Sequence, residues 1–179
     1  MVGSEIPAQL ELVRSFVNTL EVEDGTDALA TPAGLSAWVV EHGLTAESVI
    51  PTRADVRRAA ELREALRSHL LANNGATLPA SAVETVARQA ERSGVAVVFE
   101  GGAASVASTT SGVDGALGRI LAAVATAMLE GTWRRLKACA ADDCRWAFVD
   151  RSRNHSRHWC AMGVCGNRQK VRAFRARQR

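Results

Sequence analysis

The stretch that decides how this chain is interpreted is WCAMGVCGNRQKVRAFRARQR, residues 159–179. Cys160 and Cys165 stand five positions apart in it, and arginine then recurs at short intervals. A matching pair, Cys139 and Cys144, lies upstream, so the cysteines follow the spacing C-x4-C-x15-C-x4-C. Two short pairs around a longer gap are the arrangement that a tetrahedral zinc site requires. The sequence therefore predicts a Zn²⁺ ion held by Cys139, Cys144, Cys160 and Cys165.

Zinc would stabilise a segment that has little apolar core of its own. A small module buries too little surface to fold unaided, so a metal that closes a long loop supplies the missing free energy. Four thiolates complete the coordination shell, which makes the site structural and disfavours a cysteine-dependent enzyme. Four unrelated thiols are the alternative interpretation. We expect His155 and His158 to lie beside the ligands or on the surface, although either imidazole is also a candidate ligand.

Charge divides the chain into two parts. The 179 residues carry a net charge of +3. Residues 133–179 hold 13 Lys and Arg against three acids, a net +10, whereas residues 1–132 hold nine against 16, a net −7. Because the cysteines are also confined to the basic part, the sequence predicts two modules. The first is a regulatory or ligand-sensing domain over residues 1–131, and the second is a zinc module over residues 132–179.

The composition favours a folded protein in a reducing compartment. With 47% hydrophobic and 23% charged residues, the chain is typical of globular proteins. Its longest apolar run, residues 120–129, is too short to span a bilayer, and its N-terminus lacks the basic segment of a secretory signal. We therefore expect a cytoplasmic protein with no membrane partner, where thiols stay reduced and available to a metal.

Helical periodicity dominates the first module, with one change to strand periodicity. Gly101-Gly102 separates two β-rich runs, which predicts a β-hairpin over residues 94–109. Thr31-Pro32 and the pair Thr52 and Asp55 are typical helix starts. Helices are expected over about residues 12–20, 32–42, 53–72, 79–89 and 113–130. The predicted fold class is α+β, a helix-rich domain with a small hairpin followed by a treble-clef-like zinc finger.

The first module contains no recognisable catalytic set. It lacks a Walker-type loop, a dinucleotide-binding fingerprint and a nucleophile elbow, so we expect that the protein is not an enzyme. His42 and His69 are expected to be structural. Asn18 is the polar residue that stands out in the first predicted helix. Its amide either bonds to backbone carbonyls or forms the polar floor of a ligand pocket, and both interpretations stay open.

The C-terminal pattern resembles the CGNR zinc-finger family. The segments C-x4-C-x-W-x-F-x-D-x-S-R-N and S-R-x-W-C-x-M-x-x-C-G-N-R-x-K include the tetrapeptide Cys165-Gly166-Asn167-Arg168. Upstream, Phe16-Val17-Asn18-Thr19, the L-x-x-W of residues 35–38 and Gly43-Leu44 are similar to the ABATE domain that precedes this finger. The resemblance implies four cysteine ligands to zinc and a role as a stress-responsive transcription regulator. His158 stands where the family often has arginine, which leaves the ligand set intact.

Several side chains are expected to surround the metal. Residues 133–139 and 145–150 alternate like short strands on either side of the first cysteine pair. The Asn167 amide is predicted to bond the backbone of the second pair or a ligand sulfur. The aromatic residues predicted to cover the metal with apolar surface are Trp133, Trp146, Phe148 and Trp159.

A terminal helix over residues 166–177 would gather cations on one side. At about 100° per residue, Val171 and Phe174 are predicted to face inward, and Arg168, Arg172, Arg175 and Arg179 to lie within about 60° of one another. No acid occurs in residues 151–179, and unneutralised cations at this density favour a polyanion. About five phosphate contacts would give a log–log salt slope of roughly −4 to −5. The residues predicted to bind nucleic acid are Arg151, Arg153, Arg157, Arg168, Lys170, Arg172 and Arg175.

Two classes of function follow from these patterns. The first is a transcription regulator that binds DNA, ahead of RNA, through its zinc module, while the N-terminal domain senses a small-molecule effector or forms a homodimer. The second is a zinc-stabilised adaptor for an acidic protein or RNA, or a small-molecule-binding protein with a site in residues 1–131. The alternative to both is a basic C-terminal segment that is solvated and binds no partner. The target sequence, the effector and the oligomeric state are not encoded in any pattern found here.

Overall fold

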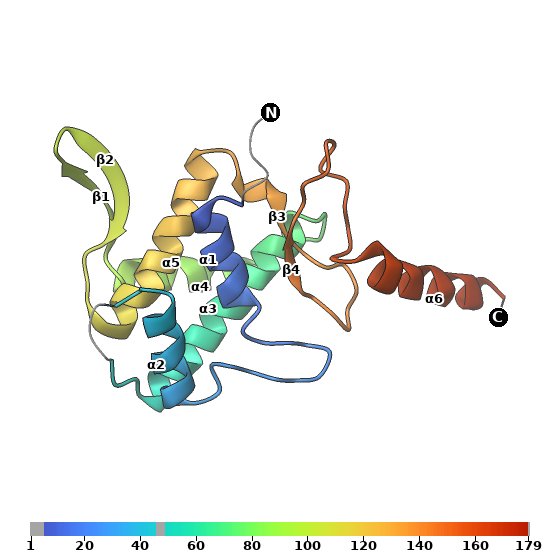
Figure 1. The fold of residues 1–179 in the computed structure, drawn as a ribbon, viewed down its shortest axis with the longest axis horizontal. Coiled ribbons are helices and arrows are strands. Elements are labelled where there is room, and N and C mark those ends of the chain that lie inside the picture. Colours follow the sequence, from blue (N-terminus) through green and yellow to red (C-terminus); the bar gives the residue numbers. More distant parts are fainter. Residues whose placement is uncertain (1–5, 46–48, 179) are drawn as a thin grey trace.

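Helices α1 to α5 form the body of the molecule, and the cysteine-rich segment lies at one end of it (Figure 1). The structure is a computed structural model that describes residues 6–45 and 49–178. The five helices of the body are α1 (Ala8–Val17), α2 (Pro32–Glu41), α3 (Arg53–Ala72), α4 (Ala80–Arg92) and α5 (Gly112–Leu129).

The two helix starts predicted at Thr31-Pro32 and at Thr52 with Asp55 are confirmed. Thr31 caps α2 by accepting a hydrogen bond from Gly34 N at 3.0 Å, with Pro32 in the first turn. Thr52 and Asp55 form a reciprocal capping box at the start of α3, which satisfies two of the amides that a helix leaves unpaired. The first helix begins and ends earlier than the expected residues 12–20, at Ala8 and Val17. It cannot reach Leu20, because Leu20 forms an isolated bridge with Asp27.

The predicted hairpin is also confirmed. Strands β1 (Val95–Glu100) and β2 (Ala103–Ser108) pair antiparallel from Val95–Ser108 to Glu100–Ala103. Gly101 and Gly102 join them at φ 57° and 80°, the left-handed conformations that a two-residue type I′ turn demands. The hairpin projects from the end of the body opposite the cysteine-rich segment (Figure 1).

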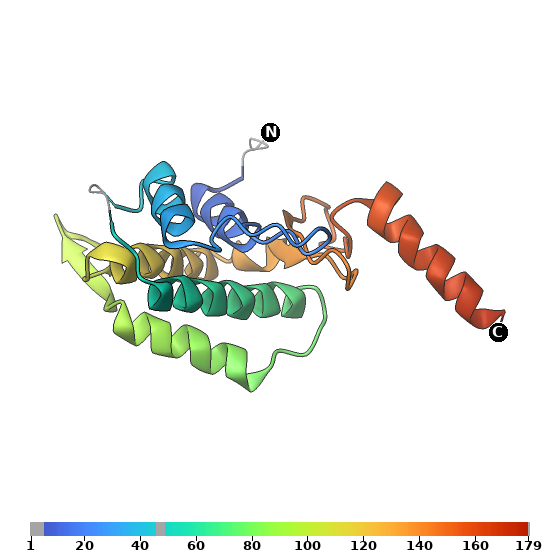
Figure 2. The same cartoon turned by 90° about the horizontal axis from the view of Figure 1, so that it is seen from below.

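The core lies where α1, α3 and α5 meet. Phe16 of α1, Leu66 of α3 and Ile120 of α5 are among its fully buried side chains. Helix α5 is long and apolar enough to cross a membrane by length and composition, but here it contributes Leu117, Ile120 and Leu121 to this core. Figure 2 shows α3 and α5 running between α4 on one side and α1 with α2 on the other.

The same core continues into the cysteine-rich segment. Strand β3 (Leu136–Ala138) pairs with β4 (Ala147–Val149), and β3 packs on α3 while β4 packs on α1. Leu136, Ala138 and Ala147 belong to the buried cluster of the helical body. Sequence and charge change near residue 131, but the packing does not divide there, so the predicted modules share one core.

One expectation about the aromatic residues of this segment and one about its strands need correction. Trp133 does not cover the metal, because it starts a single 3-10 turn (Trp133–Arg135) and is buried in the helical core. The strands are also shorter than residues 133–139 and 145–150, since this turn takes the place of the first half of the first one. Phe148 is buried in β4 and stacks under the Arg157 guanidinium, 5.1 Å from the ring centroid.

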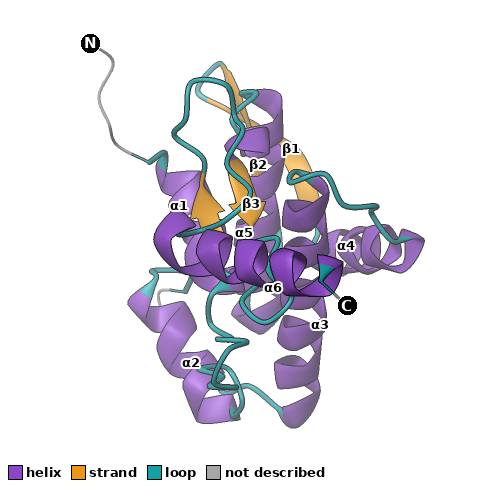
Figure 3. Cartoon of the chain, turned by 90° about the vertical axis from the view of Figure 1, so that its right-hand side faces the viewer, coloured by secondary structure: helices purple, strands orange, loops and turns teal. Residues whose placement is uncertain are grey.

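Helix α6 (Asn167–Arg177) leaves the body after a π-helical turn (Met162–Gly166), and it projects into solvent (Figures 1 and 2). Figure 3 shows α6 side-on in front of the body. The expectation that Val171 and Phe174 face inward is wrong, because they are 49% and 56% exposed. The apolar seam of this helix has no core to pack on.

Candidate zinc centre and its basic surroundings

The four cysteines meet in one cluster. Cys139 directly follows β3 and Cys144 precedes β4, so the hairpin holds the first pair. Cys160 precedes the π-helical turn that leads into α6, and Cys165 lies within this turn. All four Sγ atoms lie within 4.8 Å of one another. Cys144 and Cys160 are 3.6 Å apart, and Cys160 and Cys165 are 3.7 Å apart, measured between Sγ atoms.

This geometry fits zinc. Zn–S bonds of about 2.3 Å in a tetrahedron place the sulfurs about 3.8 Å from one another, close to the separations observed. The sulfurs are too far apart for disulfides, which need about 2.05 Å, and all four cysteines are free. Cys139, Cys144, Cys160 and Cys165 therefore form a zinc site of the closed, structural kind.

Burial shifts the pKa of three of the four thiols. Desolvation by burial, with a smaller contribution from Cys139, raises the pKa of Cys144 to about 11. The pKa of Cys160 is raised by the same two causes. Burial also acts to raise the pKa of Cys165, but donors led by Arg168 lower it overall. Because zinc binds thiolates, its binding here must displace protons.

Arg168 connects the zinc site to two other parts of the chain. Its Nη2 donates to Cys165 Sγ at 3.5 Å, and its Nη1 donates to Glu23 Oε1 at 2.7 Å. The same Nη1 lies 3.4 Å from Asp143 Oδ2, and Arg172 of α6 donates to this carboxylate oxygen at 2.8 Å. The start of α6 is thus tied to the first cysteine pair and to the loop that follows α1.

Asn167 and Trp159 lie beside the second cysteine pair. Asn167 donates from Nδ2 to Gly163 O at 3.1 Å, inside the turn between Cys160 and Cys165. Trp159 packs against the cysteine cluster, and its Nε1 is buried without a hydrogen-bond partner in the described chain. One side chain braces the turn, and the other shields the sulfurs from solvent.

A buried ion pair organises the arginine-rich loop between the two cysteine pairs. Lys137 Nζ donates to Asp150 Oδ2 at 2.8 Å, and both side chains are almost fully buried. Asp150 also accepts hydrogen bonds from Ser152 N at 2.9 Å and from Arg157 N at 3.0 Å. The sequence interpretation missed both charged residues, although Asp150 and Ser152 are part of the D-x-S-R-N segment.

Polar side chains of the helical body form hydrogen bonds with the backbone of the zinc segment. Asn18 pairs with the backbone of Ala147 in both directions, donating at 3.0 Å and accepting at 2.7 Å. Asn74 donates to Ala138 O and His158 O, each at 2.8 Å. Buried Arg67 donates to Arg145 O at 2.8 Å. These contacts fix how the zinc site sits on the body.

Asn18 also borders a shallow depression of about 380 Å³ between α1, α2 and Trp146. Within it, His42 Nε2 lies 2.7 Å from Ser15 Oγ, and His42 Nδ1 lies 2.9 Å from Trp38 O. The Asn18 amide hydrogen-bonds to backbone groups, which was the first of the two sequence interpretations. Asn18 also lines a hollow, which was the feature that the second interpretation expected.

The structure places the seven predicted nucleic-acid-binding residues around the zinc site in two groups. Arg157, Arg168 and Arg172 make contacts within the chain. Arg157 donates to Cys160 O at 2.6 Å, and Arg168 and Arg172 form ion pairs. The premise that all these cations are unneutralised is therefore wrong, because the acids Glu23 and Asp143 come from distant parts of the chain. Arg179 lies outside the described residues. The other four, Arg151, Arg153, Lys170 and Arg175, are exposed and make no ion pair within the described residues.

Comparison with known families agrees with this architecture. The CGNR zinc finger model matches residues 135–178. The model of the ABATE family, described as "Putative stress-induced transcription regulator", matches residues 10–132, which is more than half of the chain. This chain belongs to the ABATE family. A search of curated proteins returned no match. The ABATE region thus comprises α1 to α5 with the hairpin, and the CGNR finger contains the four ligands and α6.

Proposed function

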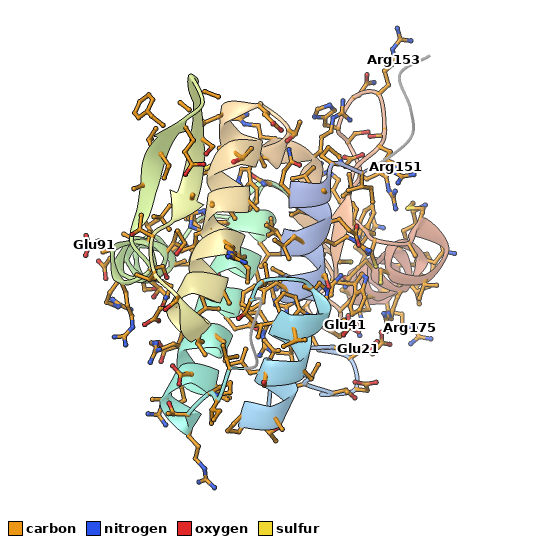
Figure 4. All side chains as sticks on the ribbon, turned by 60° about the vertical axis from the view of Figure 1, so that its left-hand side comes forward. Glu21, Glu41, Glu91, Arg151, Arg153 and Arg175 are labelled. Carbon is orange, nitrogen blue, oxygen red and sulfur yellow. The ribbon has the colours of Figure 1, made fainter. Side chains whose placement is uncertain are left out.

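We propose that this ABATE-family protein regulates transcription by binding DNA through its zinc segment and α6. The observation that carries the proposal is a group of exposed cations at one end of the molecule: Arg151, Arg153, Lys170 and Arg175. None of the four makes an ion pair within residues 6–45 and 49–178. In Figure 4, Arg151 and Arg153 project from the loop and Arg175 from α6, all on the same side of the body.

Four such cations set the expected strength and salt dependence. Each phosphate contact contributes about −0.9 to the log–log salt slope on duplex DNA. If Arg168 and Arg172 keep their carboxylate partners, the slope should be about −3.6, smaller than the sequence alone suggested. The zinc site supports this use of α6 because it fixes one end of the helix.

The test is fluorescence anisotropy of a labelled duplex over a salt series. Arg153→Ala and Arg175→Ala should each weaken binding and reduce the slope by about 0.9. Arg88→Ala is the matched control, since Arg88 is an exposed arginine of α4. Affinity weaker than about 10⁻⁴ M at low salt would contradict the proposal, because that is below ordinary non-specific binding. Equal binding to RNA or to an acidic peptide would favour the adaptor alternative.

The N-terminal domain is proposed to sense a small molecule in the depression that Ser15, Asn18, His42 and Trp146 border. The hollow adjoins both the helical body and β4, so a ligand there would contact both parts. Homodimer formation is the other proposed role, and the exposed Val97 and Phe99 of β1 offer it a surface. Sedimentation velocity with Phe99→Ser tests the second role. A cytoplasmic location and the absence of enzyme activity stay predictions.

A further inference from the structure

The free face of α6 carries apolar and basic side chains in a definite order. At about 100° per residue, Lys170, Phe174, Val171 and Arg175 follow one another around the helix axis with steps of about 40°, 60° and 40°. Asn167 and Gln178, at the two ends of the helix, fall between Phe174 and Val171 in angle. Two apolar side chains are thus flanked by one cation on each side. Phe174 is 56% exposed and Val171 is 49% exposed, so solvent reaches the apolar seam.

Ion pairs hold this face away from the body. Arg168 and Arg172 lie beyond Arg175 around the helix, about 90° and about 130° from the centre of the seam, and they bind Glu23 and Asp143. Helix α6 leaves the body from the cysteine-rich segment (Figures 1 and 2). The two pairs therefore fix the rotation of α6 about its own axis, with the seam turned away from these acids.

The order of side chains limits what the face can bind. The seam is two side chains wide, which is too narrow for a lipid-buried face, since a surface helix buries a stripe of roughly 100° or more. The flanking cations call for an anion on each side of it. A DNA major groove has these properties, because its walls are phosphates and its floor carries the C5 methyl groups of thymine. A groove about 12 Å wide admits an α-helix, and the 11 residues of α6 span about 16 Å.

We propose that α6 lies in the major groove with Phe174 and Val171 against thymine methyl groups, while Lys170 and Arg175 bind phosphates on the two sides. This inference rests on the proposed DNA binding. It adds that α6 recognises the C5 methyl group of thymine. Lys170 and Arg175 supply affinity without sequence choice, whereas the seam supplies a preference for thymine.

The test removes the methyl group from the DNA and leaves the protein unchanged. Zinc-loaded full-length protein is titrated into a 20-base-pair alternating A·T duplex and into the same duplex with deoxyuridine in place of thymidine. Losing one buried methyl contact should weaken binding about fourfold, so we expect a drop of roughly four- to 15-fold. Both duplexes carry the same charge, and their salt slopes should therefore be equal.

Protein variants test whether Phe174 and Val171 cause the preference for thymidine. Phe174→Ala should bind the thymidine duplex more weakly and lose most of its preference over the deoxyuridine duplex, and Val171→Ala should lose part of it. Arg175→Ala should weaken both duplexes alike, and the control Arg88→Ala should behave as the wild type. Zinc content and helical circular dichroism are measured for each variant, so that a folding defect is recognised.

The possible outcomes separate this inference from the proposed function. Binding to neither duplex at low salt overturns both. Tight binding to both duplexes without discrimination overturns the thymine contact and leaves DNA binding in place. If Phe174→Ala instead converts a dimer into a monomer by sedimentation velocity, the seam is an interface between copies of this chain and the inference is wrong.

Discussion

Asp150 and Lys137 form the most deeply buried ion pair among the described residues. Burial alone would raise the pKa of Asp150, but hydrogen bonds from Lys137, Ser152 and Arg157 lower it overall. Because the folded pKa is lowered, the unfolded chain binds the proton more tightly. The contribution to stability is therefore present above the ordinary aspartate pKa, near 3.9, and is lost as the pH falls through the folded value.

Replacing Asp150 with Ala should lower the free energy of unfolding by about 3–5 kcal/mol at pH 7, because it leaves the buried Lys137 ammonium without a counter-charge. Only the carbonyl oxygens of His155 and Arg157 would then accept from it. Denaturant unfolding with excess zinc measures this effect. Lys137→Met combined with Asp150→Ala should recover part of the loss. Glu84→Ala, at an exposed position of α4, is the control and should change stability little. A loss below about 1 kcal/mol for Asp150→Ala would contradict this account.

Arg168 is both a zinc-site residue and part of the basic surface. Its contact with Cys165 Sγ and its pairs with Glu23 and Asp143 link the retention of zinc to this side chain.

Arg168→Ala should speed zinc transfer to a chromogenic chelator by about tenfold or more, since removing a hydrogen-bond partner of a metal ligand typically costs about 10- to 100-fold in metal affinity. Arg175→Ala removes an exposed charge of the same helix and should leave the rate unchanged. Equal rates for the two variants would show that the sulfur contact contributes nothing.

At the scale of elements, zinc joins the β3–β4 hairpin to α6. The hairpin is supported twice, by the metal through Cys139 and Cys144 and by the core through Leu136, Ala138 and Ala147. Helix α6 has extensive contacts with the π-helical turn alone among the helices and strands of the described chain. The two elements should therefore respond differently to loss of the metal.

Zinc removal with a strong chelator under reducing conditions should release the second cysteine pair and α6 while the helical body stays folded. Hydrogen exchange followed by mass spectrometry should show faster exchange over residues 150–178 and unchanged protection in α1, α3 and α5. Readdition of zinc should restore protection. An unchanged pattern, or exchange throughout the chain, would be inconsistent with this division.

At the scale of the whole molecule, the regions that match the ABATE and CGNR models share one hydrophobic core. Trp133, Leu136, Ala138 and Ala147 of the zinc segment complete the cluster built by α1, α3 and α5. Asn18 and Asn74 satisfy backbone groups across the same junction. A change at the zinc site can therefore reach the helical body through packed side chains and hydrogen bonds.

A chain that ends at residue 132 should be unstable, because it exposes core side chains that Trp133 and the β3–β4 hairpin cover. We expect a melting temperature at least 10 °C below that of the full chain, or aggregation, by circular dichroism and size-exclusion chromatography. A chain that ends at residue 166 keeps the four cysteines and the core and is the matched control, expected to fold. A stable, monomeric 1–132 fragment would show that the ABATE region folds independently.

Local patterns determined much of this protein. The C-x4-C spacing, the Thr52–Asp55 capping box and the Gly101-Gly102 turn each depend on residues within six positions of one another, so their structures could be predicted from the sequence. The four zinc ligands and the hairpin follow from such short-range chemistry. The helix starts follow from it as well.

The tertiary structure decided which charges are free and which apolar residues are covered. Glu23 neutralises Arg168 from 145 positions away, and no periodicity encodes such a contact. For the same reason the sequence predicted an inward face for Val171 and Phe174, although α6 projects from the body and leaves them exposed. Periodicity shows that a helix has two faces, but only packing against a distant part of the chain decides whether its apolar face is buried.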